Sequence, residues 1–445
     1  MKEPEISIGI LSCKETSFDL YGDFSNRGSG KRISGRLTAK IHNGSITLIQ
    51  EGKEIYSSIE ISFAPNDIET ESFLLRDVVI GKNFHWERKE NQRFRGSLKL
   101  IIENNLITAV NIIPLEEYLT SVISSEMSPN SSFELLKAHA IVSRGWLLAQ
   151  LEKQKRGKNK KSVNEIITEE EIIRWYDRED HTKYDFCADD HCQRYQGVTK
   201  IINDNAIDAI ESTRGLVLIY DNSICDTRYS KCCGGMTESF ENVWEHKKHH
   251  YLAPVVDYKF ELDGVDYDLT SEATANKWIK SAPHAFCNSN DQRILSQILV
   301  DFDRPTNNFF RWKVEYEQKE LVEIIKSKSG IDFDKILDLI PIKRGYSGRI
   351  IKLKIVGSNK TMTIGKELEI RRILSKSHLY SSAFIVTKEN ITNDIPEKFI
   401  IEGAGWGHGV GLCQIGAAVM GEKGYGFDEI LLHYFKGARI QKIYQ

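Results

Sequence analysis

The sequence contains no long hydrophobic run. Stretches of about 18 consecutive apolar residues are absent, so a membrane-spanning helix is not expected. Residues 1–11 lack the apolar core of a signal peptide and soon acquire the pattern of a strand. Either the protein therefore stays in the cytoplasm, or the chain is a trimmed or mature form that starts at an added methionine.

A marked excess of charge of either sign is also lacking. The formal net charge is −3, and this balance gives no indication of nucleic-acid binding. The sequence has neither a Walker A loop nor the Gly-x-Ser-x-Gly turn of serine hydrolases. Its eight cysteines are too few and too irregularly spaced for a disulfide scaffold in 445 residues. A chain of this length is expected to form two or three globular domains.

Short segments rich in β-branched residues, separated by Gly, Asn and Asp turns, dominate the first 110 residues and predict a small β-sandwich or barrel. The whole chain is expected to have an α+β fold, with mostly β sheets, a central two-helix segment and a helix-bearing inserted domain. Four regions follow from this pattern: an N-terminal β region (1–110), a core with the helix pair and a His/Cys cluster (111–256), an inserted α/β excursion (257–345) and a C-terminal β region whose glycine-rich loop completes the core (346–445).

Two helices are expected in the middle of the chain. Apolar residues three and four apart predict helices over 115–126 and from about 133 towards 153, separated by Pro129. Glu126 ends the first helix in apolar company, and Arg144 falls on the apolar stripe of the second. A buried guanidinium needs an anionic or polar partner. Glu126 and a bound ligand are both candidates, and a simple helix-to-helix salt bridge is equally compatible with the pattern.

The charged stretch at 153–180 resembles an insertion. A short helix is expected there over 168–176, because Thr168 can cap it and acidic residues follow in its first turn.

A cluster of metal-ligand residue types follows this stretch. His181, Cys187, His191 and Cys192 match the types and number of ligands in a closed tetrahedral zinc site. Their spacing differs from that of a zinc finger, and a disulfide between the two cysteines or unrelated buried thiols are the alternatives. The sequence favours a structural zinc ion.

Glycines alternate with side chains over 403–411, after a strand and before a helix. No register fits the dinucleotide-binding pattern Gly-x-Gly-x-x-Gly. We expect a loop whose backbone lies against a ligand or another segment and which presents Trp406, His408 and Gln414. Trp406 would suit stacking on a sugar ring, whereas a packed tryptophan and a hydrogen-bonded core histidine are the alternative.

In combination these segments resemble the stage II sporulation protein D family, which includes the LytB-type amidase enhancers. The resemblance spans residues 5–440 and is carried, in order, by LEEYLTSVISSEM, ELLKAHAIVSRGW, CQRYQG, GGMTES, YSGR, GWGHGVGLCQIGA and EILLHYFKG. It implies a lytic transglycosylase that cleaves peptidoglycan glycan strands after their stem peptides have been removed. It also implies that Glu126 is the catalytic glutamate, that Arg144 contacts the sugar, and that the His/Cys cluster binds zinc as in some members.

The sequence departs from the family pattern in several places. The segment AHAIVSRGW stands where the family commonly has Ala-Gln-Ala-Val-Ala-Ala-Arg-Thr-Tyr, and Cys233 and Cys413 stand where it has serines. Glu126 and Arg144 survive these changes, so the chemistry stays possible, while the preferred glycan is open.

One carboxylate is enough for the implied reaction, because the muramyl 6-hydroxyl attacks its own anomeric carbon. Glu126 would protonate the glycosidic oxygen and later accept the hydroxyl proton, a role that requires partial burial. The expected reaction breaks the bond between N-acetylmuramic acid and N-acetylglucosamine in peptide-free strands and leaves 1,6-anhydro-muramyl ends. The alternative is a non-catalytic, glycan-binding enhancer of a cell-wall amidase. Either role implies an extracytoplasmic location in the cell envelope and favours a trimmed N-terminus.

Overall fold

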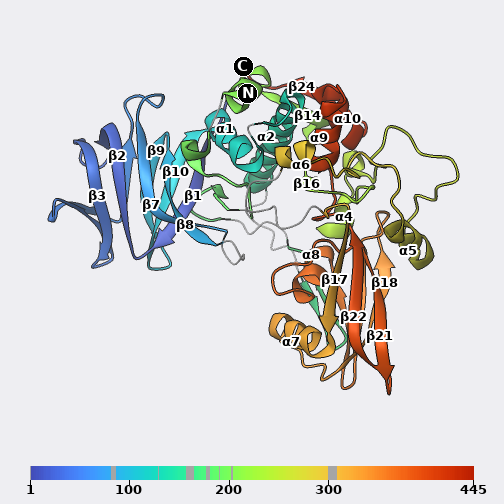
Figure 1. Cartoon of the computed structure of the whole chain (residues 1–445). Coiled ribbons are helices and arrows are strands. Elements are labelled where there is room, and N and C mark those ends of the chain that lie inside the picture. Colours follow the sequence, from blue (N-terminus) through green and yellow to red (C-terminus); the bar gives the residue numbers. More distant parts are fainter. Residues whose placement is uncertain are drawn as a thin grey trace. The chain divides into compact units, whose positions relative to one another are not determined.

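The computed structural model describes residues 2–81, 87–128, 130–156, 165–176, 181–189, 191–201, 204–298 and 308–445. These residues form a mixed α+β fold that is mostly sheet, as the sequence predicts (Figure 1). The chain separates into two compact units. The first unit comprises Met1–Pro129, Arg178–Leu216 and Lys442–Gln445, and the second comprises Asn130–Asp177 and Val217–Gln441. The division falls between the two central helices, which the sequence had grouped together.

The first unit is built on one branched sheet. Within its described residues, eleven strands join in the order β13-β1-β10-β9-β6-β2-β3-β4-β5, and β7 pairs with both β2 and β8. The strands are β1 (Glu5–Cys13), β2 (Glu15–Asn26), β3 (Arg32–His42), β4 (Ser45–Gln50), β5 (Lys53–Ser58), β6 (Glu60–Ala64), β7 (Ser72–Ile80), β8 (Arg88–Phe94), β9 (Ser97–Glu103), β10 (Leu106–Pro114) and β13 (Phe186–Cys187). Helices α1 (Leu115–Glu126) and α3 (Asn205–Ser212) and a 3-10 turn (Gly197–Lys200) complete the unit.

The long strand β2 is the point at which this sheet branches. It pairs with β3 along one edge, and with β7 and β6 along different parts of the other edge. Buried aromatic side chains fill the space beside this branch: the rings of Phe18 and Phe63 lie 5.5 Å apart, as do those of Phe73 and Phe94. The alternation of buried and exposed residues along these strands is what the sequence pattern predicts for a sheet with one buried face.

The second unit contains several smaller sheets and most of the helices. In its described residues the strands are β11 (Glu165–Ile167), β12 (Glu171–Arg174), β14 (Leu216–Tyr220), β15 (Ser223–Ile224), β16 (Tyr229–Ser230), β17 (Arg311–Glu317), β18 (Ile336–Arg344), β19 (Ile350–Gly357), β20 (Thr361–Gly365), β21 (Phe384–Thr392), β22 (Ile395–Ala404), β23 (Leu412–Cys413) and β24 (Arg439–Lys442). They pair as β11-β12-β20-β19-β18, β15-β14-β24, β16-β23 and β17-β22-β21.

The helices of the second unit are α2 (Phe133–Arg156), α4 (Phe240–Val243), α5 (Glu272–Lys280), α6 (Gln292–Ile298), α7 (Gln318–Ser329), α8 (Glu367–Ile373), α9 (Gln414–Glu422) and α10 (Phe427–Tyr434), with a 3-10 turn at His250–Leu252. One hydrophobic core joins α7 and α8 to strands β17 to β22, through Leu321 and Ile325, Ile370 and Ile373, and neighbours in the strands. Figure 1 shows α7 beside β17 and β22 in this region.

The expected helix over 168–176 is wrong: the segment contains strand β12 and the turn that joins it to β11 in a hairpin. Thr168 does accept hydrogen bonds from the amides of Glu170 and Glu171, at 3.3 and 3.0 Å, but these bonds close a turn. Parallel pairing of β12 with β20 overrides the local helix-start signal.

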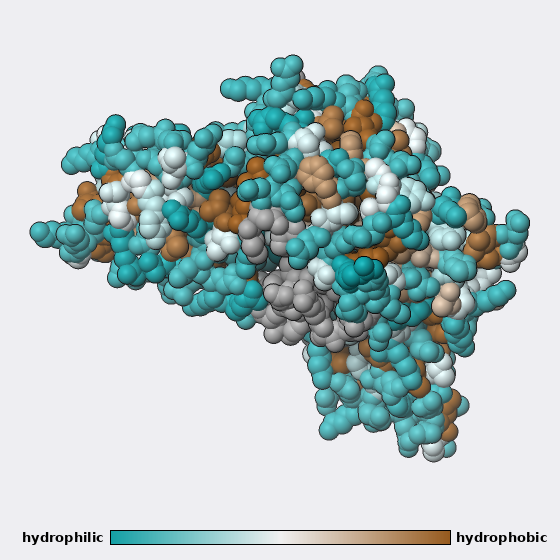
Figure 2. Space-filling model, turned by 45° about the horizontal axis from the view of Figure 1, so that its top comes forward, coloured by the Kyte–Doolittle hydropathy of each residue, from teal (hydrophilic) through white to brown (hydrophobic). Residues whose placement is uncertain are grey.

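The surface is mostly hydrophilic in the view of Figure 2, where hydrophobic residues appear in scattered patches. Among the helices that the structure describes, none is both long enough and apolar enough to cross a membrane.

The packing of α2 can be tested at Gly145, which lies in close contact with Thr227. A Cβ atom on Gly145 would lie 2.6 Å from Oγ1 of Thr227, the hydroxyl that donates to the carbonyl of Val142. Gly145→Ala should therefore destabilise the protein by about 1–3 kcal/mol through overpacking, although alanine is the better helix former by about 1 kcal/mol. The measurement is the free energy of unfolding in denaturant.

A double variant controls for other effects of the alanine. Thr227→Ala removes the group that Cβ would strike, so Gly145→Ala should cost less in that background than in the parent. Equal costs in both backgrounds would contradict the described contact.

Candidate functional site

Glu126 is the last residue of α1. The helix stops there because Met127 is extended, with φ −119° and ψ 151°, while its amide still bonds to the carbonyl of Ile123. The Glu126 side chain is partly buried, and its Oε1 accepts a hydrogen bond of 3.1 Å from the backbone N–H of Arg194. The carboxyl group is thus oriented by a backbone amide, which sequence reasoning did not identify. Arg194 lies in the motif CQRYQG, but a backbone amide cannot be recognised from residue types.

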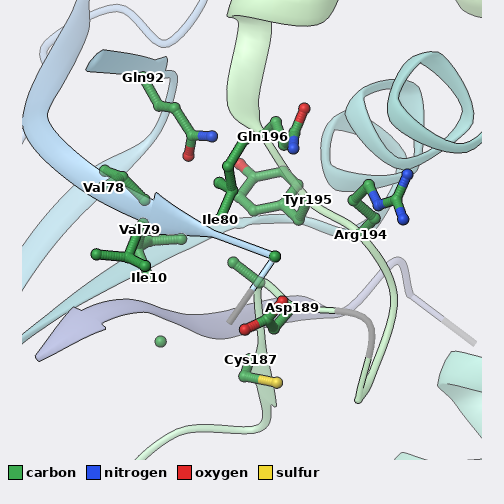
Figure 3. A pocket seen from close by; sticks show the side chains of 13 residues that line it. Ile10, Val78, Val79, Ile80, Gln92, Cys187, Asp189, Arg194, Tyr195 and Gln196 are labelled. Carbon is green, nitrogen blue, oxygen red and sulfur yellow. The ribbon is translucent and has the colours of Figure 1, made fainter. Parts of the chain in front are cut away.

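A small hollow adjoins the segment that holds Glu126. Arg194, Tyr195 and Gln196 line it together with Gly9, Ile10, residues 78–81, Gln92 and residues 187–189. Figure 3 shows Gln92 and Gln196 on one side of the hollow and Cys187 with Asp189 on the other. Gln92 is only 1% exposed, and neither of its amide atoms has a hydrogen-bond partner among the residues that the structure describes. Buried polar atoms of this kind are suited to bind a polar group or an ordered water.

The four candidate zinc ligands come together in the first unit. One ligand atom from each of His181, Cys187, His191 and Cys192 lies within 4.8 Å of the others. The Cys192 sulfur is 3.6 Å from Nε2 of His181 and 3.5 Å from Nδ1 of His191, and the Cys187 sulfur is 3.7 Å from Nδ1 of His191. All four donors can therefore point at one common centre.

Contacts with strand β1 fix this cluster. The short strand β13 pairs in parallel with β1 at Ile8 and Gly9. The ring of Tyr184 stacks on His181 at 4.6 Å and lies where a Cβ atom on Gly9 would be, at 2.5 Å. Oδ2 of Asp185 accepts hydrogen bonds from the amide and the hydroxyl of Ser7. The loop is thus held by β1 on both sides of Cys187.

The pKa of the Cys187 thiol is lowered to about 2, chiefly by its hydrogen bond with Cys192 and further by bonds with His181 and His191, while burial acts in the opposite direction. Neither cysteine is in a disulfide in this structure. A thiolate is the form in which cysteine binds metals.

Arg144 and Gln414 are buried in the second unit. Arg144 lies within α2 and is 0% exposed, as expected for a residue on the apolar stripe. Gln414 begins α9, and its Nε2 lies 3.1 Å from Nε2 of His139. His139 lies within 3.3 Å of the Ser143 hydroxyl, and its ring stands edge-on to Tyr229. Contacts of Arg144 and Gln414 with a sugar stay a prediction.

Trp406 and His408 pack against aromatic neighbours. The Trp406 ring stacks on Tyr380 at a centroid distance of 4.3 Å. His408 Nδ1 accepts a hydrogen bond from the amide of Val410, and its ring stands edge-on to Trp244 at 4.8 Å. Burial lowers the pKa of His408 well below its usual range, and nearby arginines act in the same direction. Both side chains remain partly accessible, so sugar binding by them stays a prediction.

The glycine-rich loop lies against other segments along its backbone. Trp406 and Cys232 exchange two backbone hydrogen bonds of 2.7 and 3.1 Å. The carbonyl of Gly409 accepts from the amide of Glu238, at 2.9 Å. A Cβ atom on Gly409 would lie 2.3 Å from Cζ of Arg349, so glycine is required there. This arrangement agrees with the loop expected from the sequence, and the neighbouring segment is now identified as residues 230–238.

The structure therefore groups the predicted residues in two places. Glu126 and the four His/Cys ligands belong to the first unit, whereas Arg144, Trp406, His408 and Gln414 belong to the second.

Buried His139 makes the stability of the protein dependent on pH. Burial lowers the pKa of this histidine from 6.5 to about 3. Because the folded-state pKa is depressed, the stabilisation is complete above pH 6.5 and is lost as the pH falls towards 3. The slope is up to about 1.4 kcal/mol per pH unit for one histidine. In denaturant titrations between pH 6 and 4, His139→Gln should lose stability less steeply than the parent. Replacing the exposed His42 is the control and should leave the pH dependence of the unfolding free energy unchanged. If His139→Gln also left it unchanged, His139 would not be its source.

Comparison with known proteins agrees with the resemblance seen in the sequence. Residues 103–220 match a family model described as "Stage II sporulation protein", and residues 238–411 match a domain of unknown function. The chain is 24% identical to stage II sporulation protein D of Bacillus amyloliquefaciens, over 75% of this chain and 76% of that protein.

Two further relatives extend this picture. One is an uncharacterised protein of Brachyspira hyodysenteriae, 26% identical over 78% of this chain and 72% of its own length. The other is the amidase enhancer of Bacillus subtilis, 25% identical over 54% of this chain and 33% of its own length. Together with the ordered motifs around Glu126, Arg144 and His408, these matches support the resemblance of the chain to the stage II sporulation protein D and LytB family.

Proposed function

We propose that the protein is a lytic transglycosylase of the bacterial cell envelope that acts on peptide-free glycan strands of peptidoglycan. The family is associated with sporulation and the cell wall. The observation that carries the proposal is the placement of Glu126: a partly buried carboxyl group at a helix end, fixed by the amide of Arg194, whose segment also lines a small hollow of polar and apolar residues.

The reaction needs one group that gives and then takes a proton. Glu126 donates its proton to the glycosidic oxygen as the bond between N-acetylmuramic acid and N-acetylglucosamine breaks. The muramyl 6-hydroxyl forms a bond to its own anomeric carbon, and its proton passes to the Glu126 carboxylate. No water is consumed, and the residue returns to its starting state. The hydrogen bond from Arg194 supplies positioning, because it fixes one carboxyl oxygen while the other exchanges the proton.

Substitution of the proton donor tests the proposal. Glu126→Gln keeps the shape of the side chain and its bond to the Arg194 amide but cannot transfer the proton. Release of anhydro-muramyl ends from purified peptide-free strands, measured by mass spectrometry, should fall by at least about 100-fold. Glu117→Gln on the same helix is the matched control, since Glu117 is partly exposed and pairs with Arg95. The control should cleave like the parent.

A Glu126→Gln variant that still releases anhydro ends at the parental rate would reject the catalytic role. Circular dichroism of both variants must match the parent, so that a loss of activity is not a loss of folding.

The second candidate function is a glycan-binding enhancer of a cell-wall amidase. The similarity to the amidase enhancer favours it. An enhancer would retain glycan strands in a pull-down assay but cleave no bond in the parental form or in Glu126→Gln.

We further propose that His181, Cys187, His191 and Cys192 hold a structural zinc ion. The donor set fits this metal: two imidazoles and two sulfurs lie close enough to share one tetrahedral centre. When bound, the ion would tie the loop 181–192 to β1 and so support the following segment, whose Arg194 amide holds Glu126.

Metal analysis tests this site. Replacing both His181 and Cys187 by alanine should lower the zinc content by about one ion per chain. The same change should slow glycan cleavage, because the Arg194 amide loses its support. His42→Ala with Cys13→Ser is the matched control outside the cluster. An unchanged zinc content, or a Cys187–Cys192 disulfide in the purified protein, would remove the site.

A further inference from the structure

A second cluster of metal-ligand residue types lies wholly inside the second unit. Cys233, Asp257, Cys287 and Cys413 each contribute one ligand atom, and these atoms all lie within 4.8 Å of one another. The side chains come from four distant segments, and none is more than 2% exposed. Four soft or anionic donors that converge away from solvent match the closed arrangement of a structural metal site rather than an open reactive centre.

The distances within this cluster suit a single metal ion. The sulfur atoms of Cys233 and Cys287 are 3.6 Å apart. A tetrahedral zinc ion with bonds of about 2.3 Å holds its sulfur ligands about 3.8 Å apart, whereas a disulfide places them about 2.05 Å apart. The cysteines are free in this structure. A cluster of several iron ions needs a wider arrangement of ligands, because the ligands must enclose all of the ions.

Backbone groups stabilise the Cys413 sulfur as a thiolate. Cys413 caps the N-terminus of α9, where a negative charge is favoured. Its sulfur accepts a hydrogen bond of 3.2 Å from the amide of Cys233.

Asp257 is oriented in the way expected of a metal-binding carboxylate. Its Oδ1 accepts a hydrogen bond of 2.6 Å from the Tyr434 hydroxyl, and its Oδ2 accepts one of 2.8 Å from the amide of Cys287. These outer contacts fix the carboxylate next to the sulfurs. A Cβ atom on Gly416 would lie 2.5 Å from Oδ1, so the first turn of α9 is shaped around this side chain.

Charge is the remaining argument for a cation. A buried carboxylate is strongly unfavourable in its charged form unless a positive charge compensates it. The guanidinium of Arg311 is partly buried nearby, and it donates its hydrogen bonds to the carbonyls of Gly234, Trp278, Ser281 and Phe310. A divalent ion at the common centre would supply the missing charge.

We propose that Cys233, Asp257, Cys287 and Cys413 form a buried structural site for a single zinc ion. Thiolate ligands select zinc over calcium or magnesium, and four protein donors leave no position for a substrate. The ion would join the start of α9 to the segments at 233, 257 and 287, and so hold the glycine-rich loop at its C-terminal end. The thiol of Cys232 also contacts those of Cys287 and Cys413 but lies outside the set of four.

The test uses the full chain with the other cluster disabled. In the background Cys187→Ser with Cys192→Ser, purified protein should contain about one zinc ion per chain by mass spectrometry of the metal. Adding Cys233→Ser and Cys287→Ser should reduce this to less than about a tenth of an ion. Adding Cys225→Ser instead, a change at another fully buried cysteine, should leave the zinc in place. Because the background lacks Cys187 and Cys192, the expected zinc content does not depend on whether the His181 cluster binds zinc.

X-ray absorption at the zinc edge covers the case in which the substituted chain does not fold. The Cys187→Ser, Cys192→Ser background should show three sulfur neighbours at about 2.3 Å and one oxygen at about 2.0 Å. Less than about half an ion per chain, a shell without sulfur, or a Cys233–Cys287 disulfide under non-reducing conditions would overturn the proposal.

Discussion

The hydrogen bonds of the buried Arg349 guanidinium are the interactions on which the second unit depends most. The guanidinium donates to the carbonyls of Cys233 and Gly407 and to the hydroxyl of Ser347, at 3.0 to 3.3 Å. The Ser347 hydroxyl donates in turn to the carboxylate of Glu238, at 2.6 Å. Arg349 and Glu238 are each 1% exposed, and an unpaired charge at that depth would cost several kcal/mol. The segments that meet there are therefore held in one arrangement, and the glycine-rich loop follows from it.

In the first unit, too, hydrogen bonds hold side chains in place. Backbone amides and short polar side chains fix the groups that could do chemistry: Arg194 holds Glu126, and Ser7 holds Asp185 beside the His/Cys cluster. Both candidate zinc clusters lie where regular structure is sparse. β13 has two residues, and so does β23. A metal ion in each would supply the cross-links that hydrogen-bonded strands supply elsewhere.

Local patterns in the sequence predicted the two central helices but not every strand. Apolar spacing located α1 and α2, because this signal is local. Strands β7 and β8 were not predicted, since the charged segment RKENQRF becomes a strand only through its pairing in the branched sheet. The helix expected at 168–176 failed for the same reason.

The candidate sites show the same limit. His181 to Cys192 were recognisable because all four residues fall within twelve positions. The set of Cys233, Asp257, Cys287 and Cys413 was not, because the fold gathers it from segments up to 180 residues apart. The amide of Arg194 could not be predicted from residue types at all, since every residue except proline has one. The loop around His408 was expected to lie against another segment, but its partner, Cys232, required the structure.

The most direct measurement of the central claim is cleavage of peptide-free glycan strands in water enriched in oxygen-18. If Glu126 serves an intramolecular attack by the muramyl 6-hydroxyl, the new ends are 1,6-anhydro-muramyl groups without the heavy isotope. Reducing ends that carry oxygen-18 would show hydrolysis and contradict the account, and uncleaved strands that remain bound would show a binder.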